Sequence, residues 1–297
     1  MSDSRVESQT SETRPLYWSV RRELWENRLV ALAPLFVAVS VQFSFLLSTI
    51  GMPSRRRAVL LLDAAKQRAA INEPYYFAAI ALIAFALLIA FFYCLDAMHG
   101  ERRDRSILFW KSLPVSDRTT VIAKAAIPLL VLPLYTFAVV VATQFTMLLL
   151  SSAVLLRSGL AATTWTHFLI IPEAIVLLYG LIVLAMWHAP VYAWLLLVSA
   201  WAKRATFLWA VLPFVLLAVL ETMAFKTQVV HKLLGYRIYG FYPRAFAASA
   251  HGGLPADPLS VMTPGRFLAT PGLWIGLIVA AAFLALTIRL RRYREPI

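Results

Sequence analysis

The densest group of ionisable side chains in this sequence lies in HGERRDRSILFWKS, residues 99–112. A run of charges of both signs is followed there at once by large apolar side chains. Mixed charges can match a complementary charged surface on another protein, and aromatic residues are the type that anchors protein interfaces. The segment therefore predicts a protein-docking site, carried by Glu101, Arg102, Arg103, Asp104, Arg105, Leu108, Phe109 and Trp110.

Signatures of catalysis are absent from the sequence. It contains no G-x-x-x-x-G-K-[ST] and no Gly-Lys pair, so the usual phosphate-binding loop for a nucleotide is missing. It also lacks H-E-x-x-H and G-x-S-x-G, and its five histidines are not at metal-ligand spacing. We therefore expect that the chain is not an enzyme and carries no catalytic residue, metal site or cofactor of its own.

The composition is that of a membrane protein. Of the 297 residues, 61% are hydrophobic and 14% are charged, whereas soluble domains are about half apolar and a quarter charged. The net charge of +13 then belongs mainly to loops beside the bilayer, where anionic lipid headgroups are the expected partner rather than nucleic acid. The single cysteine, Cys94, excludes an intrachain disulfide.

Apolar runs of roughly 20 residues predict spanning helices and an all-α, six-span protein. The fourth run continues beyond Pro190 to residue 201. We predict one kinked, overlong helix there, with a short re-entrant or interfacial segment as the alternative. The six spans are expected at about 29–50, 75–97, 120–149, 168–189, 206–224 and 272–288.

The distribution of Lys and Arg predicts the orientation. One set of flanks holds 17 of these residues and the other 11, so the first set is expected in the cytoplasm together with both termini. This places 99–112 on the cytoplasmic side, where Phe109 and Trp110 have anchoring in the bilayer interface as their alternative role. Arg55, Arg56 and Arg57 fall outside, against the rule.

The flanking segments have patterns of their own. Residues 1–16 are predicted to be a disordered tail. Residues 17–28 place apolar and charged side chains at helical spacing, which predicts an interfacial helix or else an ordinary polar lead-in. Lys124, one turn into the third span, is expected to snorkel to the headgroups. Aromatic and basic residues at 229–246 predict interfacial or re-entrant helices within 225–271, an inert loop being the alternative.

Two glutamates stand near the outer ends of spans. Glu173 follows Pro172 in the fourth span and Glu221 is close to the end of the fifth. Acids in spans are candidates for function because their burial is costly. We interpret both as lining an outward-opening substrate pathway; the alternative is that they bond to loop residues or snorkel to the interface.

These features together resemble a permease subunit of a type-2 ABC exporter. The resemblance rests on six spans, an N-terminal interfacial helix, HGERRDRSILFWKSLPVSD at 99–117, and the long connection before the last span. It covers about 17–294 as a single permease domain. The sequence of residues 99–117 is the most specific part of the resemblance.

The resemblance implies a bacterial inner-membrane permease homodimer that carries two copies of a separate ABC ATPase. ATP and Mg²⁺ would be bound by that ATPase, and 99–113 would be the coupling helix seated in it. The substrate is expected to be amphipathic: a lipid, a peptide or a drug-like molecule. A subunit that transmits mechanical force without moving a solute is an alternative. So is a secondary carrier, although no inverted repeat is seen.

Overall fold

A computed structural model describes residues 15–104, 106, 115–247 and 257–293. The described chain is helical, with an isolated β-bridge between Phe246 and Met262 and no strand. Six of its helices are long and apolar enough to cross a membrane, which confirms the prediction of an all-α polytopic protein. They are α2 (Arg28–Ser48), α4 (Ala64–Asp96), α8 (Leu132–Leu155), α10 (Ile170–Trp201), α11 (Thr206–Phe225) and α15 (Pro271–Tyr293).

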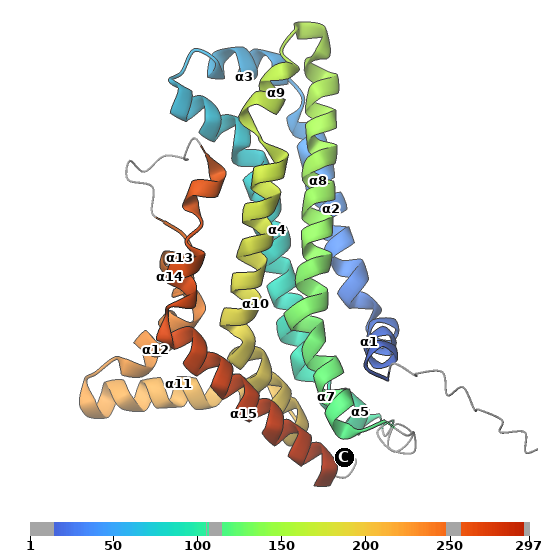
Figure 1. Cartoon of the computed structure of the whole chain (residues 1–297), viewed down its shortest axis with the longest axis vertical. Helices are drawn as coiled ribbons and strands as arrows, with labels where there is room; N and C mark the ends of the chain where they lie inside the picture. The colour runs from blue at the N-terminus through green and yellow to red at the C-terminus, as the bar shows by residue number, and fades with distance from the viewer. Residues whose placement is uncertain (1–14, 105, 107–114, 248–256, 294–297) are drawn as a thin grey trace, which may run out of the picture.

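Helices α2, α4, α8 and α10 form an elongated bundle (Figure 1). Its core is closed by large side chains from different helices, such as Phe45, Tyr75 and Leu148. Their outer faces stay apolar: Phe36 and Phe77, for example, are more than 60% exposed. A helix that is apolar on its outer face as well as its inner one is suited to lipid surroundings.

Two spanning helices, α4 and α10, are more than 30 residues long. Helix α10 continues through Pro190 as one helix of 32 residues, so the predicted overlong span is confirmed and a separate segment after Pro190 is wrong. Helix α4 begins at Ala64, earlier than predicted, because Asp63 caps it by accepting a hydrogen bond from the Lys66 N–H at 3.0 Å. The first turns of α4 are polar, so they are not part of the apolar run from which the span was predicted.

The third span also begins earlier than predicted. Helix α7 (Asp117–Ala126) leads through a π-helical turn (Ile127–Val131) into α8. Ser116 caps α7 by accepting from the Thr119 N–H at 3.1 Å. Pro128, inside the π-turn, and Pro133, just after it, lack the N–H needed for regular helical bonds, and this explains why the helix departs from α geometry there.

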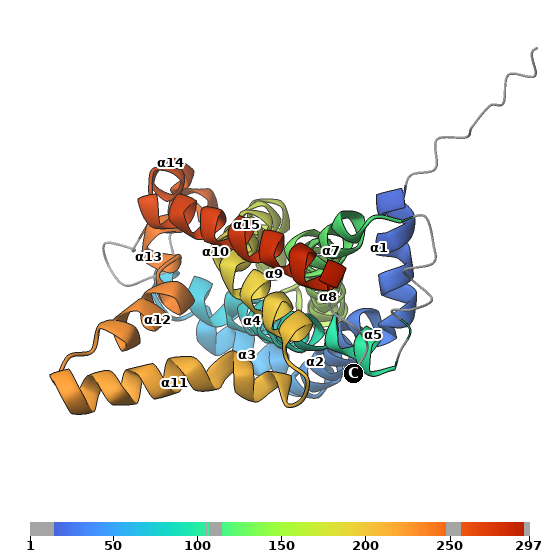
Figure 2. The ribbon, with the colours of Figure 1, turned by 90° about the horizontal axis from the view of Figure 1, so that it is seen from below.

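Helix α11 lies across the direction of the bundle in both views (Figures 1 and 2). Ala205, just before it, has φ 52°, in the left-handed region. A helix cannot continue through that conformation, so the chain turns sharply after α10. Only Ala210 of α11 is buried. Nothing in the sequence predicts this orientation.

The two described ends of the chain lie at the same end of the bundle (Figure 1). Helix α1 (Pro15–Glu26), α5 (His99–Arg103), α7 and the end of α15 meet there. The opposite end holds α3 (Met52–Val59) and α9 (Ala162–His167). Short helices lie between α11 and α15, within the predicted range 225–271. They are α12 (Val229–Tyr239), α13 (Tyr242–Ala245), a 3-10 turn at Pro258–Val261, and α14 (Pro264–Leu268).

Candidate functional site

A buried ion network joins four helices at the end of the bundle that carries 99–117. Lys124 Nζ of α7 lies 2.8 Å from Glu23 Oε1 of α1 and 3.0 Å from Glu101 Oε1 of α5. Arg291 of α15 donates to the other oxygen of Glu101. These four residues are between 0% and 7% exposed. We call Glu23, Glu101, Lys124 and Arg291 the ion network.

Neighbouring groups complete its hydrogen bonding. The Tyr93 hydroxyl donates to Glu23 Oε2 at 3.1 Å, and Arg22 lies 2.9 Å from Glu23 Oε1. Arg291 Nε is 3.2 Å from Asp117 Oδ1. Glu23, Glu101 and Asp117 thus face three cationic side chains, and the more exposed Glu26 also lies 3.7 Å from Arg22. Such balance matters because an uncompensated buried charge costs several kcal/mol.

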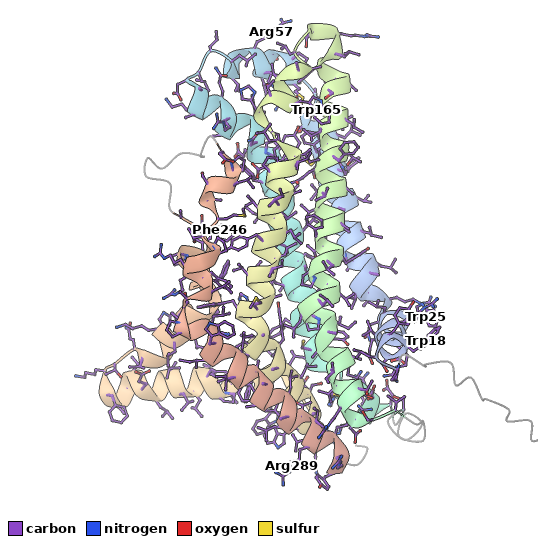
Figure 3. All side chains as sticks on the ribbon, viewed as in Figure 1. Trp18, Trp25, Arg57, Trp165, Phe246 and Arg289 are labelled. Carbon is purple, nitrogen blue, oxygen red and sulfur yellow. The ribbon has the colours of Figure 1, made fainter. Side chains whose placement is uncertain are left out.

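Helix α1 is amphipathic in a way that explains the position of Glu23. Ser19 and Glu23, four residues apart, are its buried residues and face inward. On the other side Trp18 and Trp25 are 54% and 62% exposed and point away from the bundle (Figure 3), with the Arg21 guanidinium against both rings. This pattern suits a helix that lies in a membrane interface.

The start of the 99–117 segment is fixed to the end of α10. Arg102 Nη1 donates to the carbonyls of Ala200 and Ala202 at 2.8 and 3.2 Å, where a cation is favoured by the helix dipole. Ser199 Oγ accepts from the backbone N–H groups of Met98 and His99, both at 3.0 Å. Any displacement of α5 therefore pulls on α10 as well.

The predicted docking residues divide into three groups. Glu101 and Arg102 are buried inside the chain, where they hold helices together. Arg103 and Asp104 are exposed and pair with each other at 3.1 Å, so they are the charges that a partner could meet. Arg105, Leu108, Phe109 and Trp110 lie outside the described residues.

The expectation that Lys124 snorkels to headgroups is wrong. Its side chain is 2% exposed and binds two carboxylates. Snorkelling needs a free path to water, whereas Lys124 is enclosed between α1 and α5 and paired with their carboxylates. The sequence could not show this, since Glu23 is 101 residues away.

Glu173 and Glu221 are not brought together. Glu173, in the first turn of α10, accepts a hydrogen bond from the Tyr76 hydroxyl of α4 at 2.6 Å. Glu221 of α11 accepts from Thr227 Oγ1 and from the N–H groups of Val229 and Val230 at the start of α12. The alternative interpretation, bonding to loop residues, is thus confirmed for Glu221. Figure 1 places the start of α10 and helix α11 at different heights.

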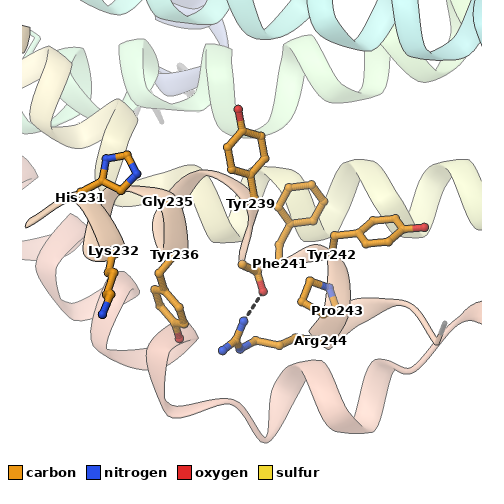
Figure 4. A pocket seen from close by; sticks show the side chains of 10 residues that line it. His231, Lys232, Gly235, Tyr236, Tyr239, Phe241, Tyr242, Pro243 and Arg244 are labelled. Carbon is orange, nitrogen blue, oxygen red and sulfur yellow. Dashed lines mark hydrogen bonds between the residues drawn. The ribbon is translucent and has the colours of Figure 1, made fainter. Parts of the chain in front are cut away.

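A second site lies around α12 and α13. Basic and aromatic side chains line a hollow of about 760 Å³ there (Figure 4). Behind it, Trp187 of α10 is fully buried and donates to the Arg237 carbonyl at 2.9 Å. The aromatic and basic mixture at 229–246 pointed to this region, but Trp187 looks in the sequence like any apolar residue of a span.

No protein-family model, curated protein or solved structure matches the chain. Within residues 15–104, 106, 115–247 and 257–293, no group of three His, Cys, Asp or Glu side chains could hold a metal ion.

Sequence reasoning missed two members of the ion network, Glu23 and Arg291, and the neighbouring Asp117. One signal was present for Glu23, because it lies four residues after Ser19 and therefore on the same helical face as that small side chain. Arg291 is one of several arginines after residue 288, and nothing in the sequence distinguishes it.

Proposed function

We propose that this chain is the permease subunit of an ATP-driven exporter of the type-2 ABC class. A separate ATPase would bind it at 99–117 and drive it between inward- and outward-facing states. The observation that carries the proposal is the ion network, because it connects both ends of that segment to the first and last helices of the chain.

The network gives the segment mechanical continuity with the bundle. Glu101 stands on α5, where the segment begins, and Lys124 on α7, just after it ends. Separating a buried pair costs about 3–5 kcal/mol, so a push from a bound ATPase moves α5 and α7 together. Helices α4 and α8 continue directly from them, and Arg291 adds α15. A displacement at one end is thereby delivered to α4, α8 and α15 together.

ATP chemistry is assigned to the partner. The chain has no phosphate-binding loop, so ATP and Mg²⁺ would be held by two ATPase subunits on a permease homodimer. We place the complex in a bacterial inner membrane with both termini in the cytoplasm. The position of α1 and the end of α15 at one end of the bundle supports this, as do the exposed tryptophans of α1.

The transported substrate is proposed to be amphipathic. Exposed Tyr239 and Tyr242 stand beside Lys232 and Arg244, and such a surface can meet both the apolar and the charged part of a molecule. The same ion network would also serve a subunit that transmits force to envelope proteins without moving a solute. A transport assay in proteoliposomes distinguishes the two.

The docking role of 99–117 is tested by pull-down of the ATPase from detergent-solubilised membranes. Phe109→Ala with Trp110→Ala should release the ATPase, because each aromatic anchor at a desolvated interface is worth roughly 2 kcal/mol. Arg103→Glu should weaken binding through charge mismatch. Arg57→Glu is the matched control, since Arg57 is exposed at the opposite end of the bundle (Figure 3).

All variants are compared at matched expression and monodispersity. If the aromatic pair and Arg103→Glu retain the ATPase as fully as Arg57→Glu does, the segment is not the coupling element.

A further inference from the structure

The connection between α11 and α15 holds more positive than negative charge among its described residues. None of the ion pairs among the described residues includes Lys232, Arg237 or Arg244. The nearby carboxylate of Glu221 is turned to the first N–H groups of α12. A group of cations that outnumbers the carboxylates around it, beside apolar helices, is unfavourable unless a ligand supplies the missing counter-charge.

Arg237 is the most constrained of these cations. Its guanidinium lies 4.9 Å from the Trp187 ring centroid and donates to the Gly272 carbonyl at 3.2 Å. Two of its nitrogens, Nε and Nη2, are shielded and have no acceptor among the described residues. A methyl group on Gly276 would come within 2.2 Å of Nη2, so the side chain is held tightly between α10 and α15. Burial lowers the pKa of Arg237.

Arg244 adds a second guanidinium to the same aromatic group. It lies 4.5 Å from the Tyr236 ring centroid and 5.8 Å from that of Trp187, and Nη1 donates to the Gly240 carbonyl at 2.6 Å. Figure 4 shows Arg244 pointing back toward Tyr236, with Lys232 projecting from α12 nearby. The side chains of Lys232, Tyr236 and Arg244 line the hollow of about 760 Å³. Arg237 lies behind it and adds positive potential.

An apolar groove adjoins this basic hollow. It has a volume of about 520 Å³, lies between α11 and α12, and is lined by side chains such as Val219, Met223 and Leu234. His231 belongs to the walls of both spaces. Met223 is 76% exposed, so the groove is open toward whatever surrounds α11. A charged hollow beside an apolar groove has the two halves that an amphiphile requires.

We propose that the hollow and the groove together bind one anionic amphiphile of the phospholipid type. Its phosphate group lies against Lys232 and Arg244, and one acyl chain lies in the groove between α11 and α12. Arginine and lysine form strong charge-assisted hydrogen bonds with phosphate, and basic pockets between membrane helices are sites for anionic headgroups. The site is built by this chain alone and does not depend on an ATPase.

The test uses the purified full chain in neutral detergent and native mass spectrometry. Short-chain phosphatidylglycerol, phosphatidylcholine with the same chains and inorganic phosphate are titrated separately. We expect one saturable phosphatidylglycerol per chain and about tenfold weaker binding of phosphatidylcholine. Lys232→Gln with Arg244→Gln should weaken phosphatidylglycerol binding about tenfold, which is roughly the loss of one charge-assisted contact. Arg57→Gln, which removes one positive charge at the other end of the bundle, should leave it unchanged.

A further variant separates headgroup from tail. Ala218→Phe fills the apolar groove without altering any charge, so it should weaken phosphatidylglycerol binding as well. Lys232 is exposed, and Lys232→Gln alone, with an expected loss of about threefold, decides the matter if the double variant fails to fold.

Three results would overturn the proposal. They are equal affinity for the two lipids, undiminished phosphatidylglycerol binding by the lysine and arginine variants, and inorganic phosphate binding that phosphatidylglycerol does not displace. The last would indicate a site for a free anion. Since no ATPase is present, each outcome is independent of the proposed transport function.

Discussion

Lys124 is the residue on which the ion network depends most. It binds Glu23 and Glu101 together, and all three side chains are at most 6% exposed. Lys124→Met would leave two carboxylates facing each other, which should cost about 3–5 kcal/mol. The measurement is the thermal unfolding midpoint of the purified chain in detergent.

The matched control is Lys66→Met. Lys66 also pairs with an acid, Asp63, at 2.9 Å, but its side chain is 73% exposed, and surface pairs contribute about 0–1 kcal/mol. Removing Glu23's charge as well, in Glu23→Gln with Lys124→Met, should recover part of the loss. Similar shifts for Lys124→Met and Lys66→Met would show that the ion network does not stabilise the fold.

Glu221 is predicted to hold the start of α12. Its carboxylate accepts from two backbone N–H groups of the first turn, and a negative charge there also suits the helix dipole. Glu221→Gln keeps the shape but removes the charge. We expect faster hydrogen exchange of residues 229–239 than in the wild type. Glu173→Gln, whose partner is on α4, should leave those residues unchanged, and equal exchange in both variants would contradict the assignment.

At the residue scale, the sequence predicted a docking segment but not how its charges are used within the chain. Mixed charges at 101–105 indicated an interface. Glu101 and Arg102 nevertheless face inward, where Glu101 pairs with Arg291, 190 residues away in the chain, and Arg102 with a carbonyl 98 residues away. Pairings over such separations leave no local pattern. Arg103 and Asp104 remain exposed as a docking surface requires.

At the element scale, the turn between α10 and α11 requires Ala205 to adopt a left-handed backbone conformation, which can be tested by substitution. Its φ of 52° costs an L-residue about 1–2 kcal/mol, and glycine avoids that cost. Ala205→Val should therefore lower the thermal unfolding midpoint, since a β-branched residue is a clear outlier in this region. Ala205→Gly should keep or raise it. A midpoint for Ala205→Val equal to that of Ala205→Gly would mean that the residue is not left-handed.

Helix number follows from the apolar runs, whereas the starts and directions of some helices do not. All six apolar runs became helices, and the run across Pro190 became one continuous helix. The crosswise position of α11 depends on one backbone angle at an alanine, which carries no composition signal. The early start of α4 depends on a cap at Asp63 placed ahead of polar turns, and hydropathy is insensitive to such turns.

At the scale of the whole molecule, the proposal is that force enters at 99–117 and leaves through the membrane helices. The segment, α1 and the end of α15 share one end of the bundle, and Arg57 marks the other (Figures 1 and 3). An ATP-binding partner should therefore be found at the first end only.

The most direct measurement is cross-linking from single cysteines combined with photolabelling by an azido analogue of ATP. The natural cysteine, Cys94, is 0% exposed, so Asp104→Cys and Arg57→Cys each offer one accessible thiol for a photoactivatable cross-linker. In membranes of the producing cell, residue 104 is expected to capture a separate chain that is labelled by the ATP analogue, and residue 57 is not. Label on the uncross-linked permease chain itself, or an ATP-binding chain captured from residue 57 and not from residue 104, would contradict the account.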